Sequence, residues 1–422
     1  MLKQKTLAEK LLLKTLEGLR HGRLELIAPS GRYVFGDPDS DLSTTLVVEN
    51  PRFFSRAVFG GDDGAGDSYV DGDWWSHDLV SLVRIIVKNL GGPRPPGARW
   101  VSAASRAVFR LQHRLRANTM AGSRRNIAAH YDLSNDFFRL FLDREMLYSC
   151  ALYKSSDDSL EQAQMNKLDH ICQKLDLQPG DHVLEIGTGW GAFAERAVTR
   201  YGCRVTTTTI SQQQHDAARQ RFDAMGRSGD RIELLLQDYR TLTGQYDKLV
   251  SIEMFEAVGL DNYDAYFVAC DRLLKPEGVM LLQTITMNEQ RFPEYHRKSD
   301  WIQRRIFPGG ELASISEILL SLGRTTSLTL THSEDIGIHY ALTLAEWRKR
   351  FHKARESVLS LNFDERFLRM WDYYLAYCEG AFRERYVGDS QLLLAKIHSS
   401  KSIFGDPATA DVIAGYARSA AR

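Results

Sequence analysis

The sequence predicts an α/β protein whose main domain is a mostly parallel sheet covered by helices on both faces, preceded by a small α+β domain. Between about residues 180 and 285, short apolar runs alternate with amphipathic runs, which is the pattern of strands alternating with helices. The glycine-rich stretch EIGTGWGAF (185–193) stands where the first of these strands turns into a helix. Such a turn lets the backbone approach a ligand closely, so we expect a binding site there.

The composition is that of a folded protein without a bulk charge. Of the 422 residues 43% are hydrophobic, and 54 basic residues balance 54 acidic ones, so the overall charge predicts no nucleic-acid partner. The five cysteines are far apart and form no C-x-x-C pair, which argues against a disulfide framework or a structural zinc site and favours a reducing cytoplasm. Apolar runs fall short of the roughly 20 residues of a membrane span, and charges interrupt the region where a secretory signal would lie. We therefore expect a cytoplasmic protein that meets a membrane only at its surface.

Residues 1–90 predict the small α+β domain. A helix over 6–19 is followed by the strand-like runs LELIA, RYVFG and TTLVVE and by a second helix near 51–59. GGDDGAGD (60–67) lacks the Gly-Lys-Ser/Thr ending of a phosphate-binding loop and is interpreted as a surface turn. GGPRPPG (91–97) is interpreted as a linker, because its prolines and glycines interrupt helices and strands.

The segment that follows is strongly basic. Between Asp78 and Asp132 there is no acidic residue, whereas ten basic residues occur there: Arg84, Lys88, Arg94, Arg99, Arg106, Arg110, Arg114, Arg116, Arg124 and Arg125. If 99–116 is helical, its apolar residues share one face and Arg106, Arg110 and Arg114 lie opposite. Such a helix either lies on anionic lipid or packs its apolar face on the core and leaves its arginines in water, and the residues leave both options open.

The main domain contains a regular series of elements. Strands are expected at VLEI (183–186), VTTTTI (205–210), IELLLQ (232–237), YDKLVSI (246–252) and VMLLQTI (279–285), with helices after the first two and over 263–274. Further strands at 327–332 and 390–398 bracket a long helical region. Parallel sheets bind ligands at the carboxyl ends of their strands, so we look for the site at those ends.

The glycine-rich turn favours S-adenosylmethionine over a dinucleotide. GTGWGA also satisfies the loose dinucleotide pattern G-x-G-x-x-G/A, but a dinucleotide site expects an acidic residue at the end of the second strand, where this chain has Thr206 to Thr209. Glu185 ends the first strand, and Asp238 follows the third at a position suited to an adenine amino group.

Motifs along nearly the whole chain resemble those of cyclopropane-fatty-acyl-phospholipid synthases, in the mycolic acid cyclopropane synthase-like superfamily. They are GDSYVDGDWW (66–75), HYDLSNDFFRLFLDREMLYSCALY (130–153), EIGTGWGAF, LLQDYR (235–240), SIEMFEAVG (251–259), RLLKPEGVMLLQTIT (272–286), WIQRRIFPGGELAS (301–314), HYALTLAEWRKRF (339–351) and MWDYYLAYCEGAFR (370–383). The resemblance implies a class I S-adenosylmethionine-dependent methyltransferase fold with helical substrate-binding insertions. It also implies a lipid-interaction domain at 1–90, a basic linker or amphipathic helix at 91–125 and a catalytic domain at 126–422.

The reaction that the resemblance implies is cyclopropanation of a cis double bond in a phospholipid acyl chain. The methyl group of S-adenosylmethionine adds to the alkene, and the resulting cation loses a proton as the ring closes. The resemblance implies bound bicarbonate as the base, held by Cys150, Glu256, Tyr340 and a backbone group of Ile285. Many family members carry histidine where this chain has Gln283, an amide that can hydrogen-bond bicarbonate but cannot relay a proton. Cys378 matches a cysteine long treated as a candidate active-site residue, although a structural or pocket-lining role is favoured because the sequence shows no base partner beside it.

The resemblance also assigns the cofactor contacts. It places Tyr148 and Ser149 at the methionine end, Glu185, Gly187 and Gly189 under the ligand, Thr209, Ser211 and Gln214 along the ribose, and Asp238 and Tyr239 at the adenine. Thr188 replaces a cysteine common in the glycine loop, an exchange that we expect to be silent. The residues predict no metal site.

Several alternatives remain open at this point. A lipid C-methyltransferase of the same superfamily would stop at a methylene- or methyl-branched chain, and Gln283 keeps that option open. A small-amine N-methyltransferase would need neither the first domain nor the basic segment, and a lipid-binding protein with an inactive methyltransferase domain would not need the intact glycine loop. The expected partner is an unsaturated phospholipid at the inner, anionic membrane surface, where we expect peripheral association. Bacterial relatives are often dimers, so a homodimer is one option.

Overall fold

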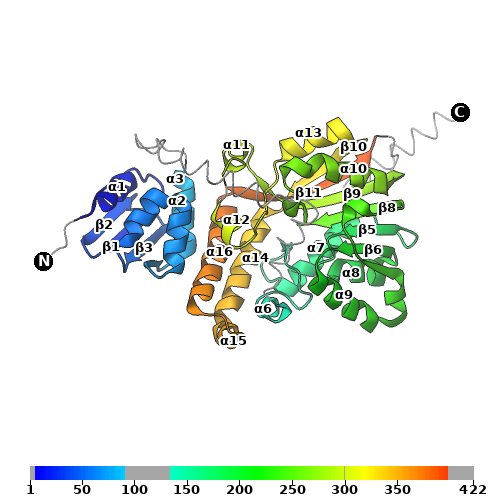
Figure 1. The fold of residues 1–422 in the computed structure, drawn as a ribbon, viewed down its shortest axis with the longest axis horizontal. Coiled ribbons are helices and arrows are strands. Elements are labelled where there is room, and N and C mark those ends of the chain that lie inside the picture. The colour runs from blue at the N-terminus through cyan, green and yellow to red at the C-terminus, as the bar shows by residue number, and fades with distance from the viewer. Residues whose placement is uncertain (1–4, 91–133, 299, 398–422) are drawn as a thin grey trace.

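Two sheets organise the residues that the computed structural model describes, which are 5–90, 134–298 and 300–397. Within these ranges a four-stranded sheet has the order β2-β1-β3-β4, and a seven-stranded sheet has the order β10-β11-β9-β8-β5-β6-β7. Figure 1 shows the smaller sheet at the N-terminal end of the molecule and the larger one at the opposite end, with long helices between them. The predicted linker and amphipathic helix, with Arg106, Arg110 and Arg114, lie outside the described residues.

The smaller sheet belongs to an N-terminal module, residues 5–90. Its elements are α1(Leu7–Leu16), β1(Arg23–Ala28), β2(Gly31–Gly36), β3(Ser43–Val48), α2(Arg52–Val70), β4(Trp74–Ser76) and α3(Leu79–Asn89). β1 pairs antiparallel with β2 and parallel with β3. Thr6 caps α1 and Asp78 caps α3 by accepting backbone N–H groups, which sets where these helices begin. The mixed α+β character predicted for this region is present.

The prediction of a surface turn at 60–67 is wrong. These residues lie inside α2, which continues to Val70 with a local break at Gly61, where φ is 57° and ψ is −144°. Glycine lowers helix propensity by about 1 kcal/mol per residue, so local preference alone favours a turn. Contacts of Gly66 and Asp67 with the rest of the protein, described below, outweigh that preference.

The larger sheet confirms the predicted α/β class. Its first part comprises α6(Asn135–Arg139), α7(Leu160–Lys174), β5(His182–Ile186), α8(Ala192–Tyr201), β6(Arg204–Thr209), α9(Gln212–Ala224), β7(Ile232–Leu236), β8(Tyr246–Ile252), α10(Tyr263–Leu273) and β9(Leu274–Met287). All pairings among β5 to β9 are parallel. β10(Leu328–Asp335) and β11(Val387–Lys396) add an antiparallel edge next to β9. This is the Rossmann-like sheet that the resemblance implies.

Helices are inserted before β10 and β11, and the two longest of them stand between the larger sheet and the N-terminal module (Figure 1). They are α11(Phe292–Tyr295), α12(Trp301–Arg305), α13(Ile315–Thr325), α14(Gly337–Lys353), α15(Arg355–Ser360) and α16(Glu365–Arg383). α14 and α16 pack along each other, and Trp347 of the first and Trp371 of the second are fully buried. These helices correspond to the predicted helical region between the last two strands and to the segment before it.

The motif GDSYVDGDWW joins the N-terminal module to these helices. The Tyr69 hydroxyl donates to Asp372 Oδ2 at 2.6 Å, and the Trp301 indole N–H donates to Asp67 Oδ1 at 3.1 Å. A Cβ atom on Gly66 would lie 2.7 Å from the Trp301 ring, so glycine is required where the two parts meet. Side chains, and not only the connecting chain, therefore hold the module on α12 and α16.

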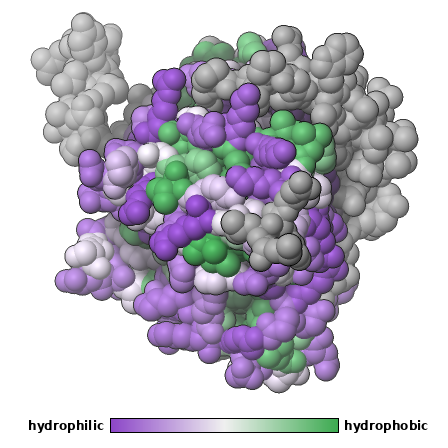
Figure 2. Space-filling model, turned by 90° about the vertical axis from the view of Figure 1, so that its left-hand side faces the viewer, coloured by the Kyte–Doolittle hydropathy of each residue, from purple (hydrophilic) through white to green (hydrophobic). Residues whose placement is uncertain are grey.

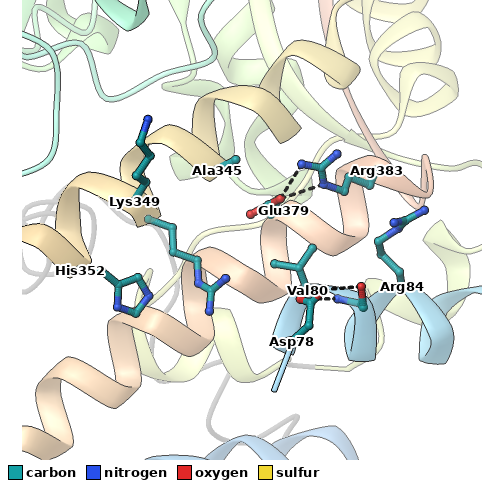
Figure 3. Close-up of a pocket in the computed structure, with 10 residues that line it drawn as sticks. Asp78, Val80, Arg84, Ala345, Lys349, His352, Glu379 and Arg383 are labelled. Atoms are coloured by element: carbon teal, nitrogen blue, oxygen red, sulfur yellow. Dashed lines mark hydrogen bonds and ion pairs between the residues drawn. The ribbon is translucent and has the colours of Figure 1, made fainter. Parts of the chain in front are cut away.

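Two residues of the predicted basic region also hold the N-terminal module on the inserted helices, a contact that we call the joint. Arg84 Nε and Lys88 Nζ contact the two carboxylate oxygens of Glu384 at 2.6 and 2.7 Å. An open pocket of about 450 Å³ lies beside them between α3, α14 and α16 (Figure 3). Other basic side chains that line it are paired as well: Arg383 with Glu379, and Arg348 and His352 with Asp372. These charges connect parts of the protein and do not form a free basic patch.

The outer face of the N-terminal module carries separate hydrophobic areas among hydrophilic ones (Figure 2). Exposed large apolar side chains of the module include Leu7, Leu11, Val34, Phe59, Ile86 and Leu90. Among the described helices, none has both the length and the hydrophobicity that crossing a membrane requires.

Candidate active site

The loop between β5 and α8 has the geometry of a cofactor cradle. Gly187, Gly189 and Gly191 all have positive φ, at 102°, 53° and 91°. A Cβ on Gly189 would meet no atom within 4 Å, whereas one on Gly191 would lie 2.7 Å from the Phe222 ring. Open space therefore lies over Gly189 at the beginning of α8, as the approach of S-adenosylmethionine requires.

Hydrogen bonds among threonine hydroxyl groups and Glu185 hold this loop in place. Thr207 Oγ1 donates to Glu185 Oε2 at 2.6 Å and also lies 2.6 Å from Thr188 Oγ1. Burial raises the pKa of Glu185 to about 8. The threonine run that argued against a dinucleotide thus supports the glycine loop, and Thr188 takes part in that support.

The other predicted cofactor residues gather at the ends of β6 and β7. Thr209 Oγ1 donates to Gln214 Oε1 at 2.9 Å, and Ser211 caps α9 by accepting the Gln214 N–H at 3.3 Å. Asp238 is buried and accepts from the Arg240 side chain at 2.9 and 2.6 Å, a partner that the sequence did not indicate. The Tyr239 ring packs on Tyr266, with ring centroids 5.3 Å apart.

Tyr148 and Ser149 come from the loop before α7, a different part of the chain from the other predicted cofactor residues. The Tyr148 ring packs against Phe138 and Trp347, and its hydroxyl lies 3.0 Å from the Tyr374 hydroxyl. Ser149 Oγ accepts from Lys167 Nζ at 2.7 Å. Lys167 is fully buried, and burial lowers its pKa. The structure therefore places a lysine that sequence reasoning missed directly behind Ser149.

Glu253, directly after β8, is the centre of a group of acidic side chains. Its Oε1 accepts from the Cys150 N–H at 2.7 Å and from Gln283 Nε2 at 2.8 Å, and its Oε2 accepts from the Tyr340 hydroxyl at 2.7 Å. The next residue, Met254, lies over the glycine loop, because a Cβ on Gly187 would approach Met254 Cβ to 3.1 Å. Glu253 therefore lies between the cofactor cradle and α14.

Gln283 and Asp389 form the buried floor of this group. Gln283 Nε2 also donates to Asp389 Oδ2 at 3.0 Å, while Gln283 Oε1 accepts from Gln391 Nε2 at 3.0 Å. The bond to Gln391 fixes the amide so that its nitrogen faces the carboxylates. Burial and the nearby charge of Glu253 raise the pKa of Asp389 well above its usual value.

Glu256 lies on a short 3-10 helix, Phe255–Ala257, three residues further along the chain. Its Oε1 accepts from the Ile285 N–H at 2.5 Å and from Thr284 Oγ1 at 2.9 Å. Among the described residues its buried Oε2 has no hydrogen-bond partner. Burial and the charge of Glu253 raise the pKa of Glu256 to about 7.

The two predicted cysteines differ in their relation to the site. Cys150 is fully buried, contributes its backbone N–H to Glu253, and has a thiol whose pKa is raised well above normal by burial. Cys378 lies on α16 beside the hydrophobic core, and burial raises its pKa too. Neither environment favours a thiolate nucleophile.

The donors expected to hold bicarbonate are already used by the chain. Cys150, Gln283 and Tyr340 donate to Glu253, and the Ile285 N–H donates to Glu256, while the Ile285 carbonyl accepts from the Ala313 N–H at 3.1 Å. The carboxylates of Glu253 and Glu256, when ionised, would also repel an added anion. The residues present, as they are bonded here, therefore do not fit a bicarbonate ion.

Sequence reasoning brought most of the site together but missed Glu253, Asp389 and Lys167. Glu253 stood in the quoted motif SIEMFEAVG, at the end of a predicted strand, where an acidic side chain is a useful signal. Asp389 could be placed only from the pairing of β11 with β9, which sets it opposite Ile285.

Comparisons with known proteins identify related sequences. The sequence profile of the mycolic acid cyclopropane synthetase family matches residues 119–392. The chain is 39% identical over 360 residues to the tuberculostearic acid methyltransferase UfaA1 of Mycobacterium tuberculosis, covering 83% of each. It is 38% identical over 364 residues to the cyclopropane-fatty-acyl-phospholipid synthase of Escherichia coli, covering 86% of this chain and 89% of that one.

Solved structures give the same result for the fold. The cyclopropane synthase MmaA2 from Mycobacterium tuberculosis matches with a TM-score of 0.60 and 35% identity, covering 65% of this chain and 98% of its own. The mycolic acid cyclopropane synthase CmaA1, complexed with SAH and CTAB, matches with the same score, identity and coverage.

Proposed function

The chain belongs to the mycolic acid cyclopropane synthetase family of S-adenosylmethionine-dependent methyltransferases, and we propose that it methylates a cis double bond in the acyl chain of an unsaturated phospholipid. S-adenosylmethionine, when bound, supplies the methyl group. Gly187, Gly189 and the beginning of α8 would hold it, with Glu185, Thr209, Ser211, Gln214, Asp238 and Tyr239 around it. Tyr148 and Ser149 lie at its methionine end in this proposal.

The observation that carries the proposal is the carboxylate group beside the cofactor cradle. Methyl addition to an alkene leaves a cation that must lose a proton, so the site needs a base and must keep water away. Glu253 and Glu256 supply carboxylates, and Met254 between them contacts the glycine loop. Tyr340 and Tyr148 contribute aromatic rings packed on Phe382 and Trp347, so the surroundings of the acidic group are rich in apolar rings.

We propose a cyclopropane ring as the product, formed when the added methyl group loses a proton and its carbon closes on the cation. One observation favours a second candidate, an exocyclic methylene group. Gln283 is bonded to Glu253, Asp389 and Gln391, so the position where many family members have histidine serves here to orient acids. A changed proton acceptor can change which product the cation gives. The 39% identity to a tuberculostearic acid methyltransferase makes this candidate worth testing.

We also propose that the protein works peripherally on the inner, anionic face of the membrane, with the N-terminal module as its lipid-interaction domain. The exposed side chains of Leu7, Leu11 and Phe59 support contact with lipid, since each leaves more than two fifths of its surface in water. Arg84 and Lys88 are paired with Glu384, so attraction to anionic lipid must come from other basic residues. Cosedimentation with anionic and neutral vesicles, using Arg106, Arg110 and Arg114 as alanine variants, tests this part.

The experiment that tests the function is incubation of the purified protein with methyl-labelled S-adenosylmethionine and vesicles of unsaturated phospholipid. Proton NMR of the released acyl chains distinguishes strained-ring methylene signals from an exocyclic alkene. Label in a cyclopropane ring is the expected result. Turnover that persists without lipid would instead indicate a small soluble acceptor such as an amine.

A further inference from the structure

We propose that the carboxylate of Glu253 is the built-in base of this site and accepts the proton that leaves the methylated acyl chain, in place of a bound bicarbonate ion. The inference rests on the function proposed above and deepens it.

The first support is the convergence of donors on one carboxylate. The Cys150 N–H, the Gln283 amide and the Tyr340 hydroxyl reach Glu253 at 2.7, 2.8 and 2.7 Å. They come from three separate parts of the chain, the loop before α7, strand β9 and helix α14. A group that receives three short hydrogen bonds is held in one orientation as an anion, which is the form a base needs.

The second support is the backbone of Glu253. Its φ is +46°, in the left-handed region where residues other than glycine are strained. Its N–H donates to the Gln283 carbonyl at 2.8 Å, so the same residue is held through both main chain and side chain. A strained residue at the end of a sheet strand persists where its surroundings fix it, and such positions cluster in active sites.

The third support is the difference in exposure within the acidic group. Gln283 and Asp389 are completely buried, whereas Glu253 and Glu256 keep part of their surface accessible. Among the acids of the group, Glu253 and Glu256 are the two residues that are not completely buried, so we look for the substrate contact there. Glu256 uses one oxygen to hold the Ile285 N–H and Thr284 at the end of β9, so we regard it as a positioning residue beside the base.

The protonation states of the neighbours fit this division. Asp389 is the more deeply buried acid, and burial and the charge of Glu253 raise its pKa well above its usual value, so Asp389 releases its proton less readily than an exposed acid. Lys167, buried nearby, offsets part of the negative charge. Burial raises the pKa of Glu253 itself, which strengthens it as a base.

The proton transfer balances without another reactant. The alkene π electrons form the new bond to the methyl carbon as that carbon's bond to sulfur breaks, which leaves the positive charge on the lipid. A C–H bond of the added methyl then breaks, its electrons close the ring, and the proton passes to a Glu253 oxygen. The proton leaves to solvent after product release.

The test compares wild type with Glu253→Gln and Glu253→Gly in buffer freed of carbon dioxide and in buffer with millimolar bicarbonate. S-adenosylhomocysteine release and the acyl product are both measured. Wild type should give the same turnover in both buffers, and Glu253→Gln should form product at least about 100-fold more slowly in both, because an amide cannot accept the proton. Glu253→Gly removes the strain of the positive φ and leaves the three donors free to bind an anion. Millimolar bicarbonate should therefore raise the turnover of this variant at least about 10-fold over its turnover in carbon dioxide-free buffer.

Glu379→Gln is the matched control, since this buried acid pairs with Arg383 away from the site and its loss should leave turnover unchanged. Cofactor binding by calorimetry establishes that each variant is folded. A wild type whose turnover falls when bicarbonate is removed, or a Glu253→Gln enzyme with near-normal product formation, overturns the assignment. Wild type that methylates no acyl chain in either buffer contradicts the proposed function itself, which is a separate and recognisable outcome.

Discussion

The hydroxyl of Tyr340 donates to Glu253 Oε2 over 2.7 Å and so connects two residues that are 87 positions apart in the chain. Tyr340 comes from the inserted helix α14, whereas Glu253 follows strand β8 of the sheet. The sheet provides the cofactor cradle, but the acidic group is completed only by the insertion. The position of the proposed base therefore depends on how α14 is held against the sheet.

Removal of the Tyr340 hydroxyl tests this dependence. Tyr340→Phe deletes one donor to the ionised form of Glu253, so the pKa of Glu253 should rise and activity should begin to fall at a higher pH on acidification. Turnover near neutral pH should fall by roughly 10-fold, because one hydrogen bond to a charged group is lost. The pH profile of kcat measures the shift. Tyr201→Phe, which removes a hydroxyl beside Asp169, is the control, and an unshifted profile for Tyr340→Phe would contradict the assigned contact.

Glu256→Gln separates positioning from proton removal. The amide oxygen can still accept from the Ile285 N–H, so we expect turnover to fall by less than about 10-fold, compared with at least about 100-fold for Glu253→Gln. The loss of a neighbouring negative charge should lower the pKa of Glu253, which moves the acid limb of the pH profile to lower pH. The profile must be measured with Asp389, Lys167, Cys150 and Tyr340 unchanged, because these groups also face Glu253. A larger loss at Glu256 than at Glu253 would reverse the two roles.

Glu185 makes stability depend on pH. Burial raises its pKa from 4.5 to about 8, so between these values the folded protein holds a proton that the unfolded chain has released. The stability associated with this proton is complete below pH 4.5 and is lost as the pH rises towards about 8. Glu185→Gln resembles the protonated acid and should resist that loss. The Tm of the variant minus the Tm of wild type, both measured without cofactor, should be larger at pH about 8 than at pH about 6, by on the order of 2 °C. A constant difference in Tm across this interval would show that Glu185 titrates normally.

Asp372 should be essential for the joint between the N-terminal module and α16. It accepts from Tyr69, Arg348 and His352 at 2.6 to 2.8 Å, and it is buried. Asp372→Asn leaves the half-buried guanidinium of Arg348 without its counter-ion, and we expect a loss of about 1.5 to 3 kcal/mol, the range for hydrogen bonds to charged groups. Urea denaturation measures the change. The exposed pair of Asp264 and Arg324 supplies the control, because Asp264→Asn should leave the midpoint unchanged.

Much of the fold could be predicted because it depends on local patterns. The strands from 183 to 285 were recognised by apolar runs, and the glycine turn by residues whose conformations only glycine adopts easily. The helix through 60–67 could not be predicted, since Gly66 and Asp67 are held by Trp301 and Arg305, more than 200 positions away. The same limit applies to Arg84, whose partner Glu384 lies 300 residues further along the chain.

The site was predicted in part for a related reason. Resemblance indicated Cys150, Gln283, Ile285 and Tyr340, and the structure places all four around acidic side chains. Which acid they bind depends on the strand register and on the positive φ of Glu253, neither of which the sequence displays. The residues expected around the cofactor lie near one another for a simpler reason, because parallel strands bring their carboxyl ends to one edge.

The joint formed by Tyr69, Asp372 and Trp301 has a consequence for how the protein could be divided. Since α16 packs along α14, which carries Tyr340, the N-terminal module acts as a brace for the helix that completes the acidic group. The two parts should then recognise each other even when no peptide bond joins them. Fragments 1–90 and 134–422 produced as separate polypeptides should assemble, and the larger one alone should bind cofactor yet react slowly.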